Sequence, residues 1–228
     1  MTADWLNLVL AALITVSLVM IALGKVTTVI RVVAAQGVLV ALVPVLSHWG
    51  ELDAPLIAVA AGNLMVKGVA FPWLLTWTAK RIHVSGAVEP RINYSLAVVA
   101  AVAFLLVSLW LGAGLQPPAG VPSSLAVPAA LFMILAGLYL IVVRRTALTQ
   151  VAGYLVIENG IFTFGTAVAW ENHAVVELGV LLDVFAAVFV MGITVFQIGR
   201  TFDSFDVGEM AQLSDRRRSS KEMSEPEG

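Results

Sequence analysis

The sequence predicts an all-α integral membrane protein with seven transmembrane helices, an N-terminus outside the membrane and a C-terminus in the cytoplasm. Of the 228 residues, 60% are apolar and only 12% are charged. The mean hydropathy of +0.95 is higher than any water-soluble domain of this size shows. The apolar residues also form seven stretches, each long enough to cross the hydrocarbon layer as a helix. These stretches are residues 5–24, 26–47, 55–79, 92–112, 121–143, 146–170 and 175–199.

The stretches divide the chain into four parts. Residues 1–113 hold the first four spans, and residues 121–199 hold the last three. Residues 114–124 are expected to be an outer linker, because their three prolines exclude a helix. Residues 200–228 form a polar tail of mixed charge, which is either disordered in the cytoplasm or a docking strip for another subunit.

The basic residues indicate the orientation. No basic residue precedes the first stretch and Lys25 follows it, so we expect a retained helix rather than a cleaved signal peptide. Cytoplasmic loops collect lysine and arginine, and an N-terminus outside places every basic residue of the loops and tail on the inner side. Arg31 then lies near the inner edge of the second span, and Lys67 lies within the third. The inner residues are Lys25, Lys80, Arg81, Arg91, Arg144, Arg145, Arg200, Arg216, Arg217, Arg218 and Lys221.

The composition excludes several kinds of site. The chain has no cysteine, so it cannot form disulfides, cysteine-ligated zinc sites or iron–sulfur clusters on its own. Its three histidines all fall in predicted loops, which makes a haem or histidine metal site within the membrane improbable. We expect the lipid bilayer as the main surroundings of the chain, and no nucleic-acid partner.

Three ionisable residues are predicted to lie near the middle of the membrane. Lys67 and Glu158 are each about 12 residues into their spans, and Asp183 is about 8 residues into the seventh, so all three lie within a turn or two of the midplane. A charge at that depth costs at least about 2.5 to 3.5 kcal/mol, which makes each residue a candidate for function. Two interpretations remain open. The residues form ion pairs that hold helices together, or they form a lateral proton relay through carboxylates, a lysine and water.

Polar neighbours support a hydrated path in the third span. Asn63 is four residues before Lys67 and shares its helical face, where its amide could hold the ammonium or a water molecule. Pro72 has no N–H, so the carbonyl of Gly68 loses its helical donor. Such a kink at membrane depth needs a polar group to satisfy the backbone again.

The last two spans carry further polar candidates. Gln150 and Tyr154 share a face on the cytoplasmic half of the sixth span, and could lead protons towards Glu158 or bond a neighbouring helix. Glu177 is close to the outer surface and is expected to be a solvated acid at a helix start.

A weak internal repeat links the two halves. Arg31 and Gln36 are five residues apart at the start of the second span, and Arg145 and Gln150 repeat this spacing at the start of the sixth. The repeat would make spans 1–3 and 5–7 parallel copies joined by the fourth span.

The run Gly-Tyr-Leu-Val-Ile-Glu-Asn-Gly-Ile-Phe, residues 153–162, and the length of the chain resemble hydrogenase-4 component E. That family is a membrane subunit of group 4 nickel-iron hydrogenase and formate hydrogenlyase complexes. The C-terminal half, from the arginine pair at 144 and 145 onward, also resembles the small K subunit of complex I and the C subunit of multisubunit cation antiporters.

The resemblance implies roles for particular residues. In the K subunit, each of the last two helices carries a glutamate in the lateral proton path. The corresponding helix here matches at Gly153 and Asn159, while its acid, Glu158, lies about one turn further along. Asp183 lies about one turn earlier than the second glutamate. Both shifts keep roughly the same helical face.

The resemblance also implies a setting in a bacterial or archaeal cell membrane. The chain would be a multi-pass, non-catalytic subunit of an oxidoreductase complex and would hold no cofactor of its own. Its partners would be antiporter-like membrane subunits, a heel membrane subunit and a peripheral hydrogenase or dehydrogenase arm that carries the nickel-iron and iron–sulfur centres.

We therefore expect a subunit that contributes to lateral proton transfer and couples electron transfer to ion translocation. Two alternatives are a subunit of a multisubunit sodium/proton antiporter and a membrane scaffold whose buried charges only form ion pairs.

Overall fold

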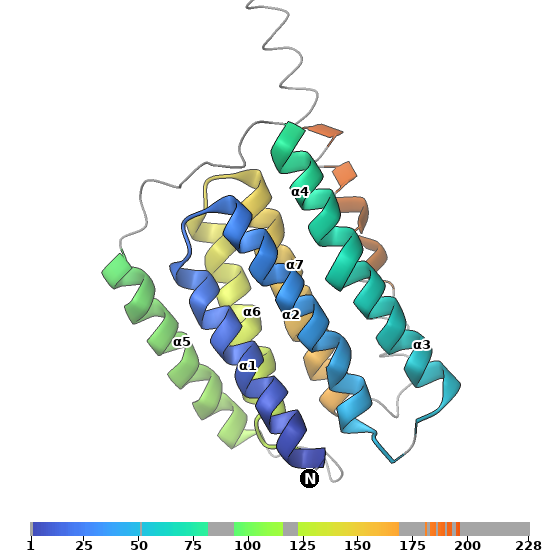
Figure 1. The fold of residues 1–228 in the computed structure, drawn as a ribbon. Helices are drawn as coiled ribbons and strands as arrows, with labels where there is room; N and C mark the ends of the chain where they lie inside the picture. Colours follow the sequence, from blue (N-terminus) through green and yellow to red (C-terminus); the bar gives the residue numbers. More distant parts are fainter. Residues whose placement is uncertain are drawn as a thin grey trace, which may run out of the picture.

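A computed structural model describes residues 2–50, 52–81, 94–115 and 123–168, together with 181, 183–185, 187–189, 191–192 and 195–196. Every element within these residues is a helix (Figure 1). The elements are α1 (Thr2–Ala22), α2 (Val26–Ser47), α3 (Ala54–Asn63), the π-helix η1 (Leu64–Ala70), α4 (Phe71–Arg81), α5 (Tyr94–Gly114), α6 (Ala126–Val143) and α7 (Ala147–Val168).

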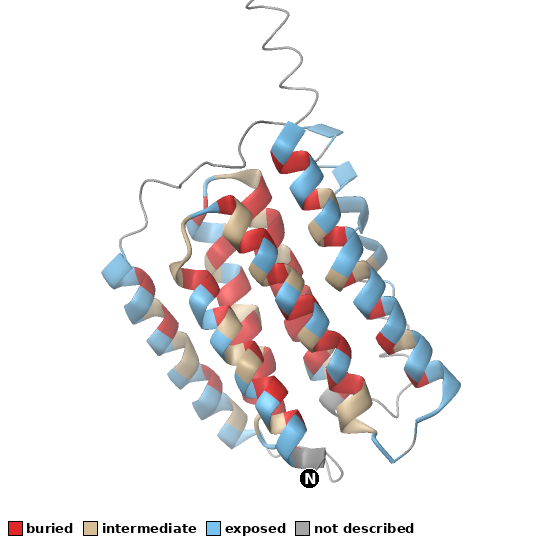
Figure 2. Ribbon diagram, in the orientation of Figure 1, coloured by how far each residue is buried: buried red, intermediate tan, exposed pale blue. Residues whose placement is uncertain are grey.

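The centre of the molecule is a four-helix arrangement of α1, α2, α7 and α6. Each of these helices packs against the next, and α6 returns to α1. The inner face of α1 shows the helical spacing that this requires, with buried side chains at Leu6, Leu10, Leu13 and Met20. α5 lies outside this bundle against α6 and α1, while α3, η1 and α4 lie on the other side against α2 (Figure 1). Buried residues therefore concentrate on the facing sides of the central helices (Figure 2).

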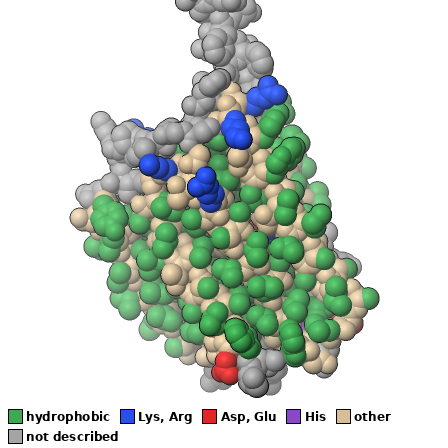
Figure 3. All heavy atoms as spheres, in the orientation of Figure 1, with side chains coloured by type: hydrophobic (Ala, Val, Ile, Leu, Met, Phe, Trp, Pro, Cys, Tyr) green, Lys and Arg blue, Asp and Glu red, His purple; other side chains and the backbone are tan. Residues whose placement is uncertain are grey.

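The outward faces are apolar. α5 exposes Leu96, Val99, Leu106 and Trp110 along its length, and hydrophobic side chains cover the sides of the molecule (Figure 3). Five helices among the described residues are long and apolar enough to span a membrane, and the continuous helix Ala54–Arg81 is one of them. These features fit a multi-pass membrane protein.

α7 combines an apolar composition with several polar residues. It has 22 residues, enough to cross the hydrocarbon layer. Three polar residues, Gln150, Glu158 and Asn159, lower its hydropathy. A helix of this kind needs neighbouring helices around its polar face.

Apart from Lys67, the basic side chains of the described residues lie towards one end of the molecule, in agreement with the predicted topology. The ends of α1, α4 and α6 carry Lys25, Arg81 and Arg145, and blue side chains gather at that end in Figure 3. Which side of a membrane this end faces stays a prediction.

The helix bounds agree with the predicted spans in part. α2 has the predicted bounds, whereas the fifth stretch, predicted from residue 121, becomes helical only at Ala126. The hydroxyl of Ser123 accepts a hydrogen bond from the Leu125 N–H, which forms a turn before α6. The described residues between 181 and 196 are helical. The rest of the seventh stretch, most of the linker and the tail of residues 200–228 lie outside the described residues, so the count of seven spans stays a prediction.

α6 and α7 approach each other closely through glycines. A Cβ placed on Gly137 would lie 2.5 Å from the carbonyl oxygen of Gly153, and one on Gly153 would lie 2.9 Å from the carbonyl oxygen of Gly137. Small residues at such contacts let helix backbones pack directly in a membrane. This contact fixes the position of α7 and therefore of Glu158.

Candidate functional site

Three ionisable side chains from separate parts of the chain meet beside α7. Lys67 Nζ lies 2.9 Å from Glu158 Oε1 and 3.0 Å from Asp183 Oδ1. We call Lys67, Glu158 and Asp183 the ionic cluster. The exposed fraction of the side chain is 3% for Lys67, 1% for Glu158 and 17% for Asp183. The three residues singled out from their predicted depth therefore share one buried site.

The face of α7 that carries Glu158 meets both partners. Tyr154, Glu158 and Phe162 are four residues apart, which places them on one side of the helix. The Phe162 ring lies under the Lys67 ammonium, 4.8 Å from Nζ to the ring centroid. The Tyr154 ring packs against Phe189, with 5.2 Å between centroids. Aromatic rings thus border the ionic cluster along α7.

A π-helix positions Lys67. Pro72 has no N–H, and in a regular α-helix its ring would clash with the carbonyl of Gly68. The chain widens into η1 just before this point, and the Phe71 N–H donates to the carbonyl of Val66, five residues back. The predicted third span, residues 55–79, is therefore one continuous helix with an inserted π segment rather than a simple proline kink. Lys67 is the central residue of that segment.

The charges of the ionic cluster do not balance. One ammonium faces two carboxylates, so the fully ionised cluster carries one excess negative charge, and binding one proton makes it neutral. Both carboxylates contact the same ammonium, Glu158 through Oε1 at 2.9 Å and Asp183 through Oδ1 at 3.0 Å. Interacting acids of this kind take up protons as a unit. Chemically, the site can hold an extra proton and exchange it between two carboxyl groups.

Asn63 lies one turn before Lys67 and is buried, with 4% of its surface exposed. Its amide nitrogen donates to the carbonyl of Val59 at 3.0 Å, which leaves Oδ1 as the atom that could accept from an ammonium. Its Oδ1 is buried and makes no hydrogen bond to any residue in the described part of the chain.

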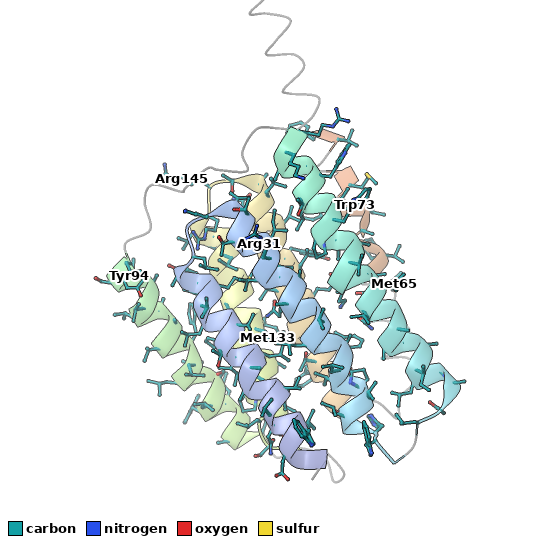
Figure 4. The ribbon with its side chains drawn as sticks, viewed as in Figure 1. Arg31, Met65, Trp73, Tyr94, Met133 and Arg145 are labelled. Carbon is teal, nitrogen blue, oxygen red and sulfur yellow. The ribbon has the colours of Figure 1, made fainter. Side chains whose placement is uncertain are left out.

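Gln36 and Arg31 do not join the ionic cluster. Gln36 is fully buried in α2 and donates to the hydroxyl of Ser17 on α1 at 2.8 Å. Ser17 in turn donates to the carbonyl of Leu13. Arg31 is exposed on the outer side of α2 (Figure 4). In the other half of the weak repeat, Gln150 bonds a loop carbonyl instead, so the matched glutamines have different partners.

The two arginines before α7, Arg144 and Arg145, lie in different surroundings. Arg144 is buried, and its guanidinium donates to carbonyls at the end of α1, at 3.2 Å for Ile21, and also to Leu23. Gln150 donates to the carbonyl of Arg144 at 2.9 Å. Arg145 is exposed and points away from the helices (Figure 4). Gln150 therefore fastens the α6–α7 loop to the first turn of α7.

The remaining predicted residues lie apart from the ionic cluster or outside the described chain. Asn159 follows Glu158 directly and is buried. The Thr163 hydroxyl donates to its backbone carbonyl at 2.8 Å. Glu177 falls outside the described residues.

Sequence reasoning missed three features of this site. Phe162 could have been found from its spacing of four residues after Glu158. The π-helical hydrogen bonding of η1 was indicated in the sequence only by Pro72. The close approach of Gly37 to Lys67 had no indication in the sequence. Within the described ranges, no group of three His, Cys, Asp or Glu side chains could hold a metal ion.

Comparisons with known proteins find relatives that match more than two thirds of the chain. It is 29% identical over 194 residues to an uncharacterized protein of Mycobacterium tuberculosis, covering 82% of this chain and 86% of that relative. It is 30% identical over 158 residues to the hydrogenase-4 component E of Escherichia coli, covering 68% of this chain and 71% of the relative. The hydrogenase-4 component E of Shigella flexneri matches to the same extent. No family model matches the chain, and no solved structure matches it significantly.

Proposed function

The chain belongs to the hydrogenase-4 component E family, and from this premise we propose that it is a membrane subunit of a hydrogenase-type complex that carries part of a lateral proton path. The observation that supports the path is the ionic cluster, in which Lys67 Nζ contacts Glu158 and Asp183 at 2.9 and 3.0 Å in a buried site. The subunit itself performs no bond chemistry. It couples electron transfer in a partner to proton movement in the membrane.

The proton step follows from the composition of the cluster. A proton that reaches Glu158 or Asp183 neutralises the excess negative charge, and the ammonium of Lys67 is then shared with one remaining carboxylate. Movement of the proton between the two acids changes which of them Lys67 pairs with. A cluster with two acids and one lysine can therefore accept a proton from one side and release it on the other without ever holding more than one uncompensated charge.

The proposed partners follow from the family. They are antiporter-like membrane subunits, a heel membrane subunit and a peripheral arm that holds nickel-iron and iron–sulfur centres. The apolar outer faces of α5 and of the Ala54–Arg81 helix give such membrane subunits, as well as lipid, surfaces to contact.

The same geometry suits a second candidate function, in which the buried ion pairs only hold helices together. Lys67 stays paired with Asp183 when Glu158 loses its charge, so ion pairs that only hold helices together would leave the proton uptake of an assembled complex unchanged in a Glu158 variant. The scaffold function and the proton path therefore predict different results for the same variant.

Glu158→Gln separates the two. The amide keeps the shape of the side chain but cannot carry a proton. If the cluster conducts, the complex assembles on a native gel, transfers electrons to an artificial acceptor and loses proton uptake in sealed vesicles. Unchanged proton uptake in the assembled complex would favour the scaffold and remove Glu158 from the path.

A further inference from the structure

Pro72 and the π-helix together leave the main-chain carbonyl of Lys67 without its regular helical hydrogen-bond donor. In an α-helix this carbonyl would accept from the Phe71 N–H, but Phe71 donates to Val66 instead. In a continued π-helix the next donor would come from residue 72, and proline has no N–H. Neither helical donor is therefore available to Lys67.

Gly37 of α2 lies directly against this carbonyl. A Cβ added to Gly37 would lie 2.5 Å from the carbonyl oxygen of Lys67, 2.7 Å from its carbonyl carbon and 3.1 Å from the nitrogen of Gly68. All three atoms belong to the main chain, so no side chain can turn aside to make room. A carbonyl oxygen this close to a Cα also suits a weak C–H···O contact between helices.

The register of η1 controls where the Lys67 ammonium points. One residue changes the direction of a helical side chain by about 100°. Conversion of the π segment to an α-helix would rotate one half of the Ala54–Arg81 helix relative to the other by that angle. Lys67 Nζ, which now contacts both carboxylates within 3.0 Å, would turn away from at least one of them.

We propose that Pro72 and Gly37 are positioning residues for Lys67. Pro72 fixes the π register that directs the ammonium at Glu158 and Asp183, and Gly37, which has no side chain, leaves space for the carbonyl of Lys67. The role in proton transfer rests on the proposed function above, whereas the role in the register does not.

A disulfide between α2 and η1 tests the register directly. The chain has no cysteine, and a Cβ on Gly68 would lie 3.3 Å from Val38 Cγ2 and 3.9 Å from the nitrogen of Val38. Because Cγ2 of Val38 is one bond from its Cβ, cysteines at the two positions would have their Cβ atoms close to the separation of about 3.5 to 4.5 Å that a disulfide needs. The double variant Val38→Cys/Gly68→Cys, in the assembled complex, should therefore cross-link on mild oxidation.

Two further substitutions in that double variant should disturb the cross-link. Pro72→Ala restores an N–H and permits the α register, and Gly37→Ala forces the two backbones apart. Each should lower the disulfide yield by about fivefold, because disulfides form only over a narrow range of Cβ positions. Gly62→Ala is the matched control, since Gly62 lies on the same continuous helix with nothing within 4 Å of an added Cβ. Unchanged yields for both Pro72→Ala and Gly37→Ala would overturn the proposal.

The role of Pro72 and Gly37 in proton transfer is tested in variants without the two cysteines. The quantity measured is the number of protons moved per electron transferred in sealed vesicles. Pro72→Ala and Gly37→Ala should lower this ratio about as much as Lys67→Gln does, while Gly62→Ala leaves it unchanged. A lowered disulfide yield with a normal ratio would overturn the positioning role. If Lys67→Gln itself leaves the ratio unchanged, the proposed proton path fails, and the disulfide yields still decide whether Pro72 and Gly37 set the register.

Discussion

The ionic cluster carries one cation and two anions, so its members are not equivalent in their effect on stability. Lys67 is the only charge that compensates Glu158 and Asp183 within the cluster. Its removal leaves two buried carboxylates facing each other, whereas removal of one acid leaves a simple ion pair.

Lys67→Met should therefore destabilise the complex more than Glu158→Gln, by about 3 to 5 kcal/mol, the cost of a buried charge without its partner. The double variant Lys67→Met/Glu158→Gln should be more stable than Lys67→Met alone, because only one uncompensated acid remains. The dissociation temperature of the detergent-solubilised complex measures all three variants. A double variant that is less stable than either single one would contradict this order.

Much of this site could be predicted from residue types and depth. Lys67, Glu158 and Asp183 stood out because an apolar span makes an ionisable residue costly, and their similar depth suggested that they meet. The partners of Asn63, Gln36 and Gln150 could not be predicted. An amide in a helix can bond its own preceding turn, a neighbouring helix or a loop at similar cost, and only the tertiary packing selects among these.

At the scale of the elements, the loop before α7 is held by a buried arginine rather than by a surface charge. The guanidinium of Arg144 donates to the carbonyls of Met20 and Ile21 at 3.5 and 3.2 Å. These carbonyls belong to the last turn of α1, where the regular α-helical hydrogen bonds end. The cation also complements the negative end of the α1 dipole. Arg144 thereby fixes the α6–α7 hairpin against the α1–α2 hairpin.

Arg144→Ala should destabilise the protein by about 1.5 to 3 kcal/mol, the value of hydrogen bonds made by a charged group. Arg145→Ala is the control, because Arg145 is exposed and its loss should change stability by no more than about 0.5 kcal/mol. Thermal unfolding of the solubilised protein, followed by circular dichroism, compares the two variants. Equal effects would show that the arginine pair acts only through its charge at the surface.

The sequence predicted that the helices exist more reliably than it predicted the geometry within each helix. Long apolar stretches predicted α2 to the residue, since a helix that spans a membrane must bury its backbone polar groups within itself. The π segment in Leu64–Ala70 depends on how the ring of Pro72 is accommodated, and the late start of α6 depends on a turn at Ser123. Both are local choices that hydropathy does not determine.

At the scale of the whole molecule, the basic end and the apolar sides set an orientation that can be measured. The described helices place Lys25 and the arginine pair at one end and the α2–α3 connection, with Gly50, at the other. If the N-terminus is outside, the end with Lys25 faces the cytoplasm.

Single cysteines in this cysteine-free chain test the orientation. A membrane-impermeant maleimide should label Gly50→Cys in intact cells, and should label Lys25→Cys only in inverted vesicles. Ser219→Cys in the tail should behave like Lys25→Cys if the seventh stretch crosses the membrane. Labelling of Ser219→Cys from the outside would instead show that an even number of spans precedes the tail.

The central claim is that the ionic cluster moves protons, and the ratio of protons moved to electrons transferred measures it most directly. The ratio is determined in sealed vesicles for Lys67→Gln, Glu158→Gln and Asp183→Asn, each normalised to the amount of assembled complex. If the cluster conducts, each variant still transfers electrons and its ratio falls by at least about tenfold, a barrier increase of about 1.4 kcal/mol. An unchanged ratio in all three assembled variants would contradict the proton path and leave the cluster as a structural ion pair.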